Sequence, residues 1–525
     1  MDKVLEVIAK VNSAINGVVW GWPMIVLILG TGILLTIRTK CMQVRKFGTS
    51  LNETIIPTVK SIGKKRAKDK NANSISQFEA FATAISGTVG TGNIVGVTSA
   101  IMTGGPGAVV WMWVSAFFGM ITNYAENVLG LYFRKKEKNG DFSGGPAYYL
   151  SEGIGVNSSG KFGAVLKSLG KVLGVMAAVF CTFAAIGMSG VQTNKISGTF
   201  QNVLSGNDTV VGLVVGIVVA VVLALIVLGG IKAIGKVTAC LVPFMSLLFI
   251  AMALIVIFAN VTAIGGAFAL IFGNMFKFES AVAGFSGYLF AQIIQKGLAR
   301  GVFSNEAGLG SSVIAHSASE TREPVKQGLW GVFEVFFDTF VICTLTALVV
   351  LVTTDTQTLY AVNESGALVY SDTAISMGAF ESLFGGFGTA VYSIIIPLFA
   401  FTTILAWSYY GEKSIDFLFR KTGEKGRKIA TTVFKVAYVL LVIVSALIDG
   451  ELAWAISDTF NGLIALPNLI GLVIMSGLVV KITKNYFDRK KGKEVAPMLS
   501  AYPEQNQAFI EDEAALETPE TEQNP

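Results

Sequence analysis

Eight residues inside an apolar run decide the fold: Ser86-Gly87-Thr88-Val89-Gly90-Thr91-Gly92-Asn93. The run around them, residues 78–102, is long enough to cross a bilayer as a helix, which takes about 20 apolar residues. Three glycines, two threonines and an asparagine within eight positions make a poor helix. In a membrane such backbone is tolerated only where it lines a cavity or is buried in protein. The stretch therefore predicts a broken membrane helix with a binding site at the break.

Close helix packing is the alternative interpretation of these glycines. Gly87 with Gly90, or Gly92 with Gly96, could let a neighbouring membrane helix approach closely. A packing motif requires neither threonine nor asparagine, so the added polar residues favour a site. At such breaks, freed carbonyl groups coordinate a cation and exposed N–H groups hold a carboxylate.

The composition indicates a membrane protein. Of the 525 residues, 52% are hydrophobic and 14% are charged, and the mean hydropathy is +0.62. A soluble protein carries about 25% charged residues, so lipid must cover much of this surface. The four cysteines form no close pair and the only histidine is His316. Neither a transition-metal centre nor a hydrolase triad is expected, and the sequence predicts no enzyme, no resident cofactor and no nucleic-acid partner.

About eleven apolar runs are long enough to span a bilayer, which predicts an all-α integral membrane protein. They cover residues 18–37, 78–102, 106–133, 172–200, 210–229, 238–258, 281–302, 327–352, 389–410, 429–448 and 454–480.

Basic and non-basic connections alternate along the chain. The stretches 38–70, 134–138, 232–236, 300–326, 413–428 and 481–493 are basic, whereas 103–105, 205–208 and 353–388 contain no Lys or Arg, and 260–279 contains one. Because positive charge is retained inside, the alternation predicts a multi-pass protein of the cell membrane with its N-terminus outside and its C-terminus in the cytoplasm.

A second irregular span begins near residue 281, contains Gly284, Gly287 and Gly297, and runs into residues 300–311. It is the sixth of the ten spans that follow the first. Two five-helix halves with interrupted first helices predict an inverted repeat. We expect an N-terminal span with a basic connection at 1–75, repeats at 76–260 and 261–484, and a disordered acidic tail at 485–525.

Several polar residues lie in otherwise apolar spans. Thr402 and Thr403 could bond to their own helix or offer two hydroxyl oxygens to a cation. Glu334 and Asp338 are spaced i, i+4 and could share a polar seam, and whether they bind a cation, carry a proton or only join helices is open. Glu126 and Asp458 could lie near enough to a membrane end to be hydrated. His316 is expected at the surface of a loop.

A series of motifs, in order along the chain, resembles the alanine or glycine:cation symporter family. The motifs are Gly87-Thr-Val-Gly-Thr-Gly-Asn-Ile94, Gly104-Gly-Pro-Gly107, Trp111-Met-Trp113, Gly144-Gly-Pro-Ala-Tyr-Tyr149, Arg300-Gly-Val-Phe-Ser-Asn-Glu-Ala-Gly-Leu-Gly310, Glu334-Val-Phe-Phe-Asp-Thr339 and Trp407-Ser-Tyr-Tyr-Gly-Glu412. The resemblance implies a leucine-transporter-like fold of 5+5 inverted repeats, with one extra N-terminal helix.

The resemblance also implies site residues. Thr91, Gly92 and Asn93 would receive the substrate carboxylate. The walls of a small side-chain pocket would be Gln192, Phe290, Ile294 and Trp407. Sodium would bind to backbone carbonyls of Ser86, Val89 and Phe399 and to the hydroxyls of Thr402 and Thr403. Lys195, beside Gln192, is unexpected in such a helix.

The function expected from the resemblance is sodium-coupled import of a small neutral amino acid, alanine or glycine, by alternating access. Its partners would be the amino acid, the co-transported sodium ion and the lipid bilayer. Two alternatives are a proton-coupled carrier that uses Asp338 or Glu334 and a passive channel, since broken helices also line pores.

Overall fold

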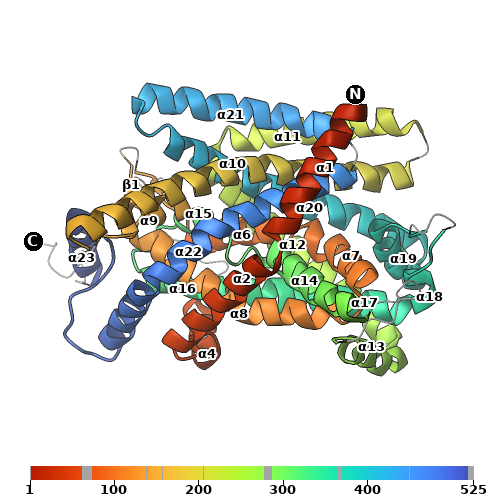
Figure 1. Ribbon diagram of the computed structural model, residues 1–525, viewed down its shortest axis with the longest axis horizontal. Helices are drawn as coiled ribbons and strands as arrows, with labels where there is room; N and C mark the ends of the chain where they lie inside the picture. Colours follow the sequence, from red (N-terminus) through yellow and green to blue (C-terminus); the bar gives the residue numbers. More distant parts are fainter. Residues whose placement is uncertain are drawn as a thin grey trace, which may run out of the picture.

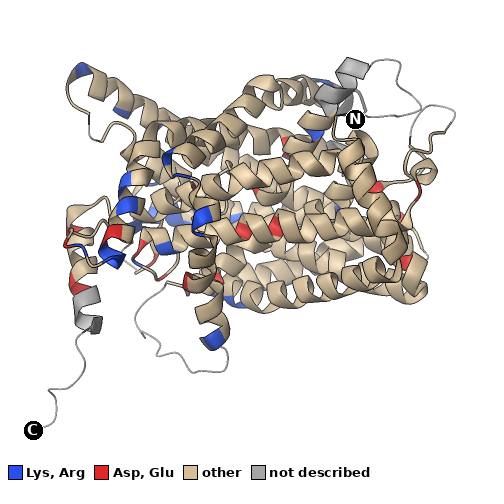
Figure 2. Cartoon of the chain, turned by 90° about the horizontal axis from the view of Figure 1, so that it is seen from below, with Lys and Arg blue, Asp and Glu red and all other residues tan. Residues whose placement is uncertain are grey.

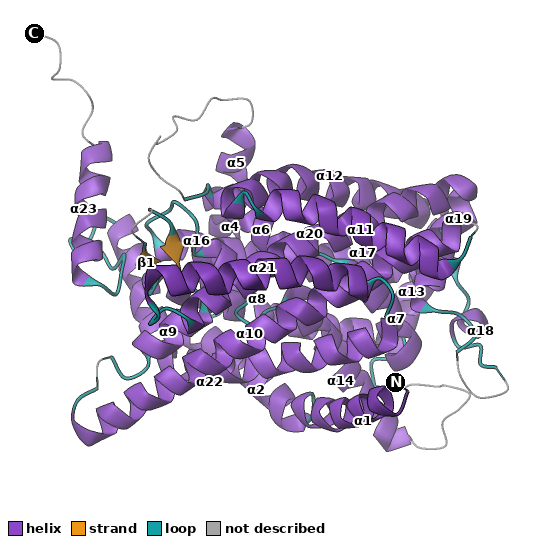
Figure 3. Ribbon diagram, turned by 90° about the horizontal axis from the view of Figure 1, so that it is seen from above, coloured by secondary structure: helices purple, strands orange, loops and turns teal. Residues whose placement is uncertain are grey.

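The computed structural model describes residues 2–61, 74–137, 140–156, 158–204, 206–276, 286–363, 368–448 and 450–517. These ranges fold as a bundle of helices (Figures 1 and 3). Within them, the ladder-forming strands are β1 (Lys135–Lys136) and β2 (Phe142–Ser143), which form a small antiparallel hairpin.

Eight helical segments in the described ranges are long and apolar enough to cross a bilayer. They are α8 (Ala108–Tyr132), α10 (Gly160–Val203), α11 (Asp208–Val227), α12 (Gly230–Ala259), the continuous run of α16 (Pro324–Val335), η2 (Phe336–Cys343) and α17 (Thr344–Thr353), α20 (Gly386–Leu418), α21 (Gly423–Ser445) and α22 (Gly450–Lys490). A ninth span is the bent pair α1 (Asp2–Val19) and α2 (Trp22–Arg38), with a bend of 41°.

Two further spans are broken. The first consists of α6 (Gln77–Thr88), the short 3₁₀ helix η1 (Thr91–Asn93) and α7 (Val95–Gly104). The second consists of α14 (Ser286–Asn305), an irregular stretch and α15 (Val313–His316). The described parts of both overlap the runs that the sequence predicts to be interrupted spans.

Helices at equivalent positions of the two halves pack against each other. Thus α8 packs on α16, α10 on α20 and α11 on α21. This pairing is the arrangement that an inverted repeat produces. The peripheral helices are α11 and α21, because only 33% and 22% of their most apolar windows are buried, against 67% for α8. Both helices lie along one edge of the bundle in Figure 1.

Short helices connect the spans. The basic connection after α2 forms α3 (Met42–Arg45), α4 (Phe47–Glu53) and α5 (Ile55–Ser61). The connection at 353–388, which contains no Lys or Arg, forms α18 (Thr356–Leu359) and α19 (Asp372–Phe384). The others are α9 (Pro146–Gly153) and the apolar α13 (Val261–Gly273), which the sequence reading treats as a connection.

The predicted disorder of the acidic tail differs from the structure. Helix α22 continues to Lys490, and α23 (Pro503–Glu517) packs against the rest of the chain. Phe509 and Leu499 form a buried apolar cluster with Phe142 of the hairpin. The acidic composition of the tail gives no indication of these two apolar residues, Leu499 and Phe509. Their burial stabilises the packing of the segment against the rest of the chain. Residues 518–525 lie outside the described ranges. Lys and Arg residues gather at the end of the bundle that carries α23 (Figure 2).

Candidate functional site

The first helix break is closed by its own asparagine. Helix α6 ends at Thr88, and residues 86–93 are all buried. The side-chain Oδ1 of Asn93 accepts a hydrogen bond from the backbone N–H of Gly90 over 2.9 Å. Asn93 thus fixes the turn that separates α6 from α7, and the predicted irregular backbone is present at the predicted residues.

Gln192 of α10 lies against this break. Its Oε1 accepts from the hydroxyl of Thr91 over 2.9 Å and from the backbone N–H of Thr91 over 3.4 Å. The structure therefore brings together two of the residues that the family resemblance assigns to the substrate.

The threonine pair of α20 faces the same break. The Thr403 hydroxyl lies 2.9 Å from the Ser86 carbonyl oxygen and 3.0 Å from that of Phe399. The Thr402 hydroxyl donates to the Phe399 carbonyl over 3.0 Å. Val89, the fifth residue of the predicted cation site, is buried in the turn that follows α6. Four of the five residues are thus joined by hydrogen bonds, and oxygens from α6 and α20 converge between the two helices.

Close packing also explains two of the glycines. A Cβ at Gly87 would lie 2.8 Å from the Tyr410 hydroxyl, and a Cβ at Gly90 would lie 2.5 Å from the Thr403 hydroxyl. Both glycines allow α20 to approach the first helix break closely. Close helix packing and a binding site at this break are therefore compatible interpretations.

Asp338 adds a buried carboxylate beside Asn93. Its Oδ1 accepts from Asn93 Nδ2 over 2.6 Å, and its Oδ2 accepts from the hydroxyls of Ser304 (2.9 Å) and Thr339 (2.8 Å). Asp338 lies in the π-helical stretch η2, and such stretches are frequent at functional sites. Three donors stabilise its negative charge, and they connect the first broken helix to α14 and η2.

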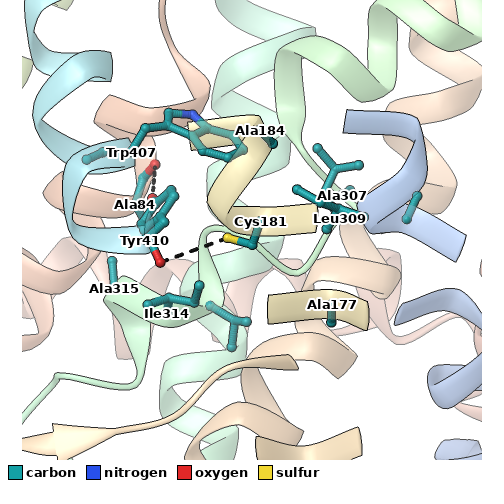
Figure 4. Close-up of a cluster of buried hydrophobic side chains, with 14 of the residues drawn as sticks. Ala84, Ala177, Cys181, Ala184, Ala307, Leu309, Ile314, Ala315, Trp407 and Tyr410 are labelled. Atoms are coloured by element: carbon teal, nitrogen blue, oxygen red, sulfur yellow. Dashed lines mark hydrogen bonds between the residues drawn. The ribbon is translucent and has the colours of Figure 1, made fainter. Parts of the chain in front are cut away.

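The second helix break contains three residues in the left-handed region: Glu306 (φ 54°), Gly308 (φ 97°) and Gly310 (φ 73°). Glu306 accepts from the Ser311 hydroxyl over 2.5 Å and from Trp407 Nε1 over 3.0 Å. Trp407, a predicted pocket wall, therefore contacts the second break rather than a residue of 91–93. Its ring lies among apolar side chains that include Ala307 and Leu309 (Figure 4).

The side-chain walls near Gly92 differ in part from the prediction. A Cβ at Gly92 would lie 3.4 Å from the ring of Phe303, which stacks on Trp454 with ring centroids 5.0 Å apart. Ile294 does not line this region, because it packs with Ile25 of α2. Ile294 precedes Phe303 by nine residues, about two and a half helical turns, so the two side chains point to opposite faces of α14. The side chain of Phe290 lies outside the described residues.

Sequence reasoning missed Phe303 and Trp454 as wall residues. Phe303 lies within the motif of residues 300–310, which is a usable signal. Trp454 lies beside the ring of Phe303 only because α22 crosses the site, and no local pattern predicts that contact.

The structure also shows the surroundings of His316 and of the carboxylates Glu334 and Asp338. His316 is fully buried rather than on a loop surface, because its Nε2 lies 2.8 Å from Glu334 Oε2 and its Nδ1 lies 2.5 Å from Gln327 Nε2. Glu334 and Asp338 do not share partners, since the π-helical turn between them directs Asp338 toward Asn93 instead.

Glu126 and Asp458 are the other two acidic residues that the sequence places in membrane spans. Glu126 is fully buried and accepts from Asn468 Nδ2 over 2.5 Å, so it is not hydrated at a membrane end. Asp458 accepts from Asn16 of α1 over 3.1 Å and joins the extra N-terminal helix to α22. The unexpected Lys195 forms a 3.2 Å ion pair with Asp372 of α19.

Two broken helices, facing each other across a bundle of paired repeats, define a class of protein: a membrane carrier with the leucine-transporter-like fold. Solved structures agree. A Na⁺-coupled sialic acid symporter superposes with a TM-score of 0.52 at 11% identity, over 95% of this chain and 99% of that one. MhsT in complex with L-phenylalanine gives a TM-score of 0.50 at 16% identity, over 79% and 99%.

The chain belongs to the sodium:alanine symporter family, whose model matches residues 5–500. It is 39% identical to the sodium/alanine symporter AgcS of Methanococcus maripaludis over 93% of this chain and 99% of that protein. It is 34% identical to the probable sodium/glutamine symporter GlnT of Bacillus subtilis, over 94% and 93%. The protein is therefore a cation-coupled amino acid symporter of the membrane and not an enzyme.

Proposed function

We propose that this protein imports a small neutral amino acid, alanine or glycine, together with sodium by alternating access. The observation that carries the proposal is the contact between the two halves of the site: Thr403 of α20 lies 2.9 Å from the Ser86 carbonyl, directly before the break at Gly90. Two of the proposed cation ligands, Ser86 and Val89, therefore lie on the same stretch of backbone as the proposed carboxylate cradle, and α20 contacts that stretch.

The substrate carboxylate would bind at Thr91, Gly92 and Asn93. These residues lie just before α7, whose N-terminus carries the positive end of the helix dipole and free N–H groups. Gln192, Phe303 and Trp454 border the same region. The Phe303 ring leaves little room beside Gly92, which favours a substrate amino acid with a small side chain. Trp407 and Phe290 remain predicted walls.

Sodium would bind between α6 and α20. Carbonyl oxygens of Ser86, Val89 and Phe399 and the hydroxyls of Thr402 and Thr403 are oxygen ligands, which hard cations prefer. In the structure both hydroxyls point at carbonyl oxygens. With a cation between the helices, each hydroxyl would turn a lone pair toward it, and the cation would hold the break in the conformation that accepts the carboxylate.

Reciprocal binding tests this proposal. The affinity of the purified protein for labelled alanine is measured at several sodium concentrations, with choline replacing sodium at constant ionic strength. We expect sodium to raise the alanine affinity, and alanine to raise the sodium affinity by the same factor, because linkage is reciprocal. Alanine binding that is independent of sodium would contradict the proposal.

Proton coupling is the second candidate, and a specific observation favours it. Asp338 is a fully buried carboxylate in direct contact with Asn93, so its protonation would change the cradle. A proton-coupled carrier would take up alanine without sodium and would respond to an inward pH gradient. Asp338→Asn would then abolish coupling to protons, whereas a sodium-coupled carrier would keep its sodium dependence in that variant.

The orientation of the protein is also a proposal. The basic stretches 38–70, 413–428 and 481–493 support placing these connections and the C-terminus in the cytoplasm of the cell that bears the protein. Sodium and amino acid would then enter from the outer side, where Lys195 and Asp372 form their ion pair.

A further inference from the structure

A basic pocket lies between the extra N-terminal helix and the last span. It has a volume of about 360 Å³ and is formed by the end of α2, by α3 and by the final turns of α22. Six of its lining side chains are Lys or Arg and one is acidic: Arg38, Lys40, Arg45, Lys46, Lys484, Lys491 and Asp488. The pocket lies at the end of the bundle where Lys and Arg gather (Figures 1 and 2). We call it the α2–α22 pocket.

The positive charge of this pocket is not balanced by the protein. In the part of the chain that the structure describes, none of the six basic side chains forms a salt bridge with an acidic side chain. The one acidic residue, Asp488, is already paired with Lys493 over 2.8 Å. Six basic residues against one acidic residue leave an excess of positive charge at the pocket, which favours the binding of an anion. The pocket therefore fits a ligand with at least one negative charge.

Two contacts shape the pocket before any ligand binds. Arg38 donates to Ser476 of α22 over 2.7 Å, which ties α2 to α22. Lys46 lies over the ring of Phe487, 5.0 Å from its centroid. These contacts hold two cations at the pocket wall, so less side-chain freedom is lost when an anion binds.

The surface beside the pocket is apolar and faces lipid. Ile37 is 70% exposed and Val44 is 57% exposed on the α2–α3 side. On α22, Val473, Val480 and Lys484 fall at intervals of 7 and 4 residues, so they lie on one face within about 40° of each other, and Lys491 directly follows the end of the helix. That face changes from apolar to basic toward the end of the helix. A ligand with an anionic head and apolar tails would match the whole stripe.

We propose that the α2–α22 pocket binds the phosphate-bearing headgroup of an anionic membrane phospholipid, with its acyl chains on the apolar faces of α2 and α22. Arg38 and Arg45 would bind phosphate oxygens in a bidentate way, and the lysines would add point charges. The lipid bridges the extra N-terminal helix and the last span. The proposal is independent of which amino acid or cation is transported.

The test compares ligands on the purified protein in a neutral detergent. Dioctanoyl-phosphatidylglycerol is titrated while thermal unfolding is followed by tryptophan fluorescence, and dioctanoyl-phosphatidylcholine and inorganic phosphate are titrated in parallel. We expect phosphatidylglycerol to raise the unfolding temperature saturably, the other two ligands to have little effect, and added salt to weaken the shift. An equal shift with inorganic phosphate would overturn the lipid assignment in favour of a free anion.

Variants place the effect in the pocket. In R45Q/K484Q/K491Q we expect phosphatidylglycerol affinity to fall by about fivefold for each charge removed, which corresponds to about 1 kcal/mol. The matched control is K421Q/K425Q/K428Q, which changes three exposed lysines outside the pocket, in the α20–α21 connection and the first turns of α21. Size-exclusion profiles in detergent verify that both variants are folded. Phosphatidylglycerol binding that is equal in both variants would overturn the proposal.

Discussion

Thr403 and Ser86, which are 317 residues apart in the chain, are joined by a 2.9 Å hydrogen bond from the threonine hydroxyl to the serine carbonyl. The bond joins α20 to α6 two residues before the residue at which α6 ends. A cation bound at the proposed site between these helices would therefore contact the end of α6, close to the Gly90–Asn93 turn. This relationship is the basis of the first two predictions.

Thr402→Val removes one hydroxyl from the proposed cation site and keeps the shape of the side chain. We expect the sodium concentration for half-maximal uptake to rise about tenfold, since one charge-assisted contact of about 1.5–3 kcal/mol is lost. The matched control is Thr346→Val, because the Thr346 hydroxyl, like that of Thr402, donates to a carbonyl oxygen in the preceding helical turn, at Ile342. An unchanged sodium dependence in Thr402→Val would argue against this cation site.

Gly90→Ala introduces a methyl group 2.5 Å from the Thr403 hydroxyl. Since this distance is far below van der Waals contact, α20 must move away from α6, and we expect uptake to be lost with a folded protein. Gly198→Ala is the control, because no heavy atom lies within 4 Å of a Cβ at that position. Normal uptake by Gly90→Ala would show that the close contact of α6 and α20 is not required for transport.

Asn93→Ala removes the side-chain acceptor of the Gly90 N–H and one of the three donors to the Asp338 carboxylate. We expect alanine binding to fall by about tenfold to a hundredfold, because a lost hydrogen bond to a charged group costs about 1.5–3 kcal/mol. Alanine affinity at saturating sodium is the measurement, with size-exclusion profiles as the folding check. Asn260→Ala, which removes a bond to the residue's own helix at Val256, should bind alanine normally. Wild-type affinity in Asn93→Ala would disprove the carboxylate assignment.

Lys195 and Asp372 form an ion pair in which each side chain is about one-fifth exposed (20% and 22%). A double-mutant cycle with Lys195→Ala and Asp372→Ala should give a coupling energy of about 0.2–1 kcal/mol in unfolding experiments, the range for partly solvated pairs. The charge-reversed pair should recover only part of this energy, because Asp372 also stabilises the first turn of α19 and a lysine there opposes the helix dipole. Strictly additive single variants would mean that the pair is not coupled.

The docked C-terminal segment gives a proteolysis prediction. Phe509→Ala should undock α23 from Phe142 and Leu499 and speed tryptic cleavage at the lysines between α22 and α23. Gln507→Ala is the control, since Gln507 is exposed and bonds only to Glu511. Equal cleavage rates in the two variants would contradict the role of Phe509 as the anchor.

Much of the fold could be predicted from the sequence. Apolar run length predicts the spans, and the mixture of glycine with Thr91 and Asn93 predicts the first break, because both follow from local chemistry. The proximity of Ser86, Phe399, Thr402 and Thr403 agrees with what the family resemblance implies, because the leucine-transporter-like fold brings these parts of α6 and α20 together.

The rest depends on helical phase and on tertiary contacts. Ile294 was placed on the pocket face, but its direction depends on where α14 ends, and nine residues before Phe303 it points the opposite way. His316 appears in a basic loop by sequence, yet Glu334 and Gln327 supply buried partners from α16. Composition likewise could not reveal that Phe509 has an apolar partner in the distant β1–β2 hairpin.

One measurement tests the central claim most directly: uptake of labelled alanine into proteoliposomes with an inward sodium gradient, an equal sodium concentration on both sides, or an inward proton gradient without sodium. The account predicts accumulation above the external alanine concentration only with the inward sodium gradient, and its loss in Gly90→Ala. Accumulation driven by protons alone, or entry that never exceeds equilibration, would contradict it.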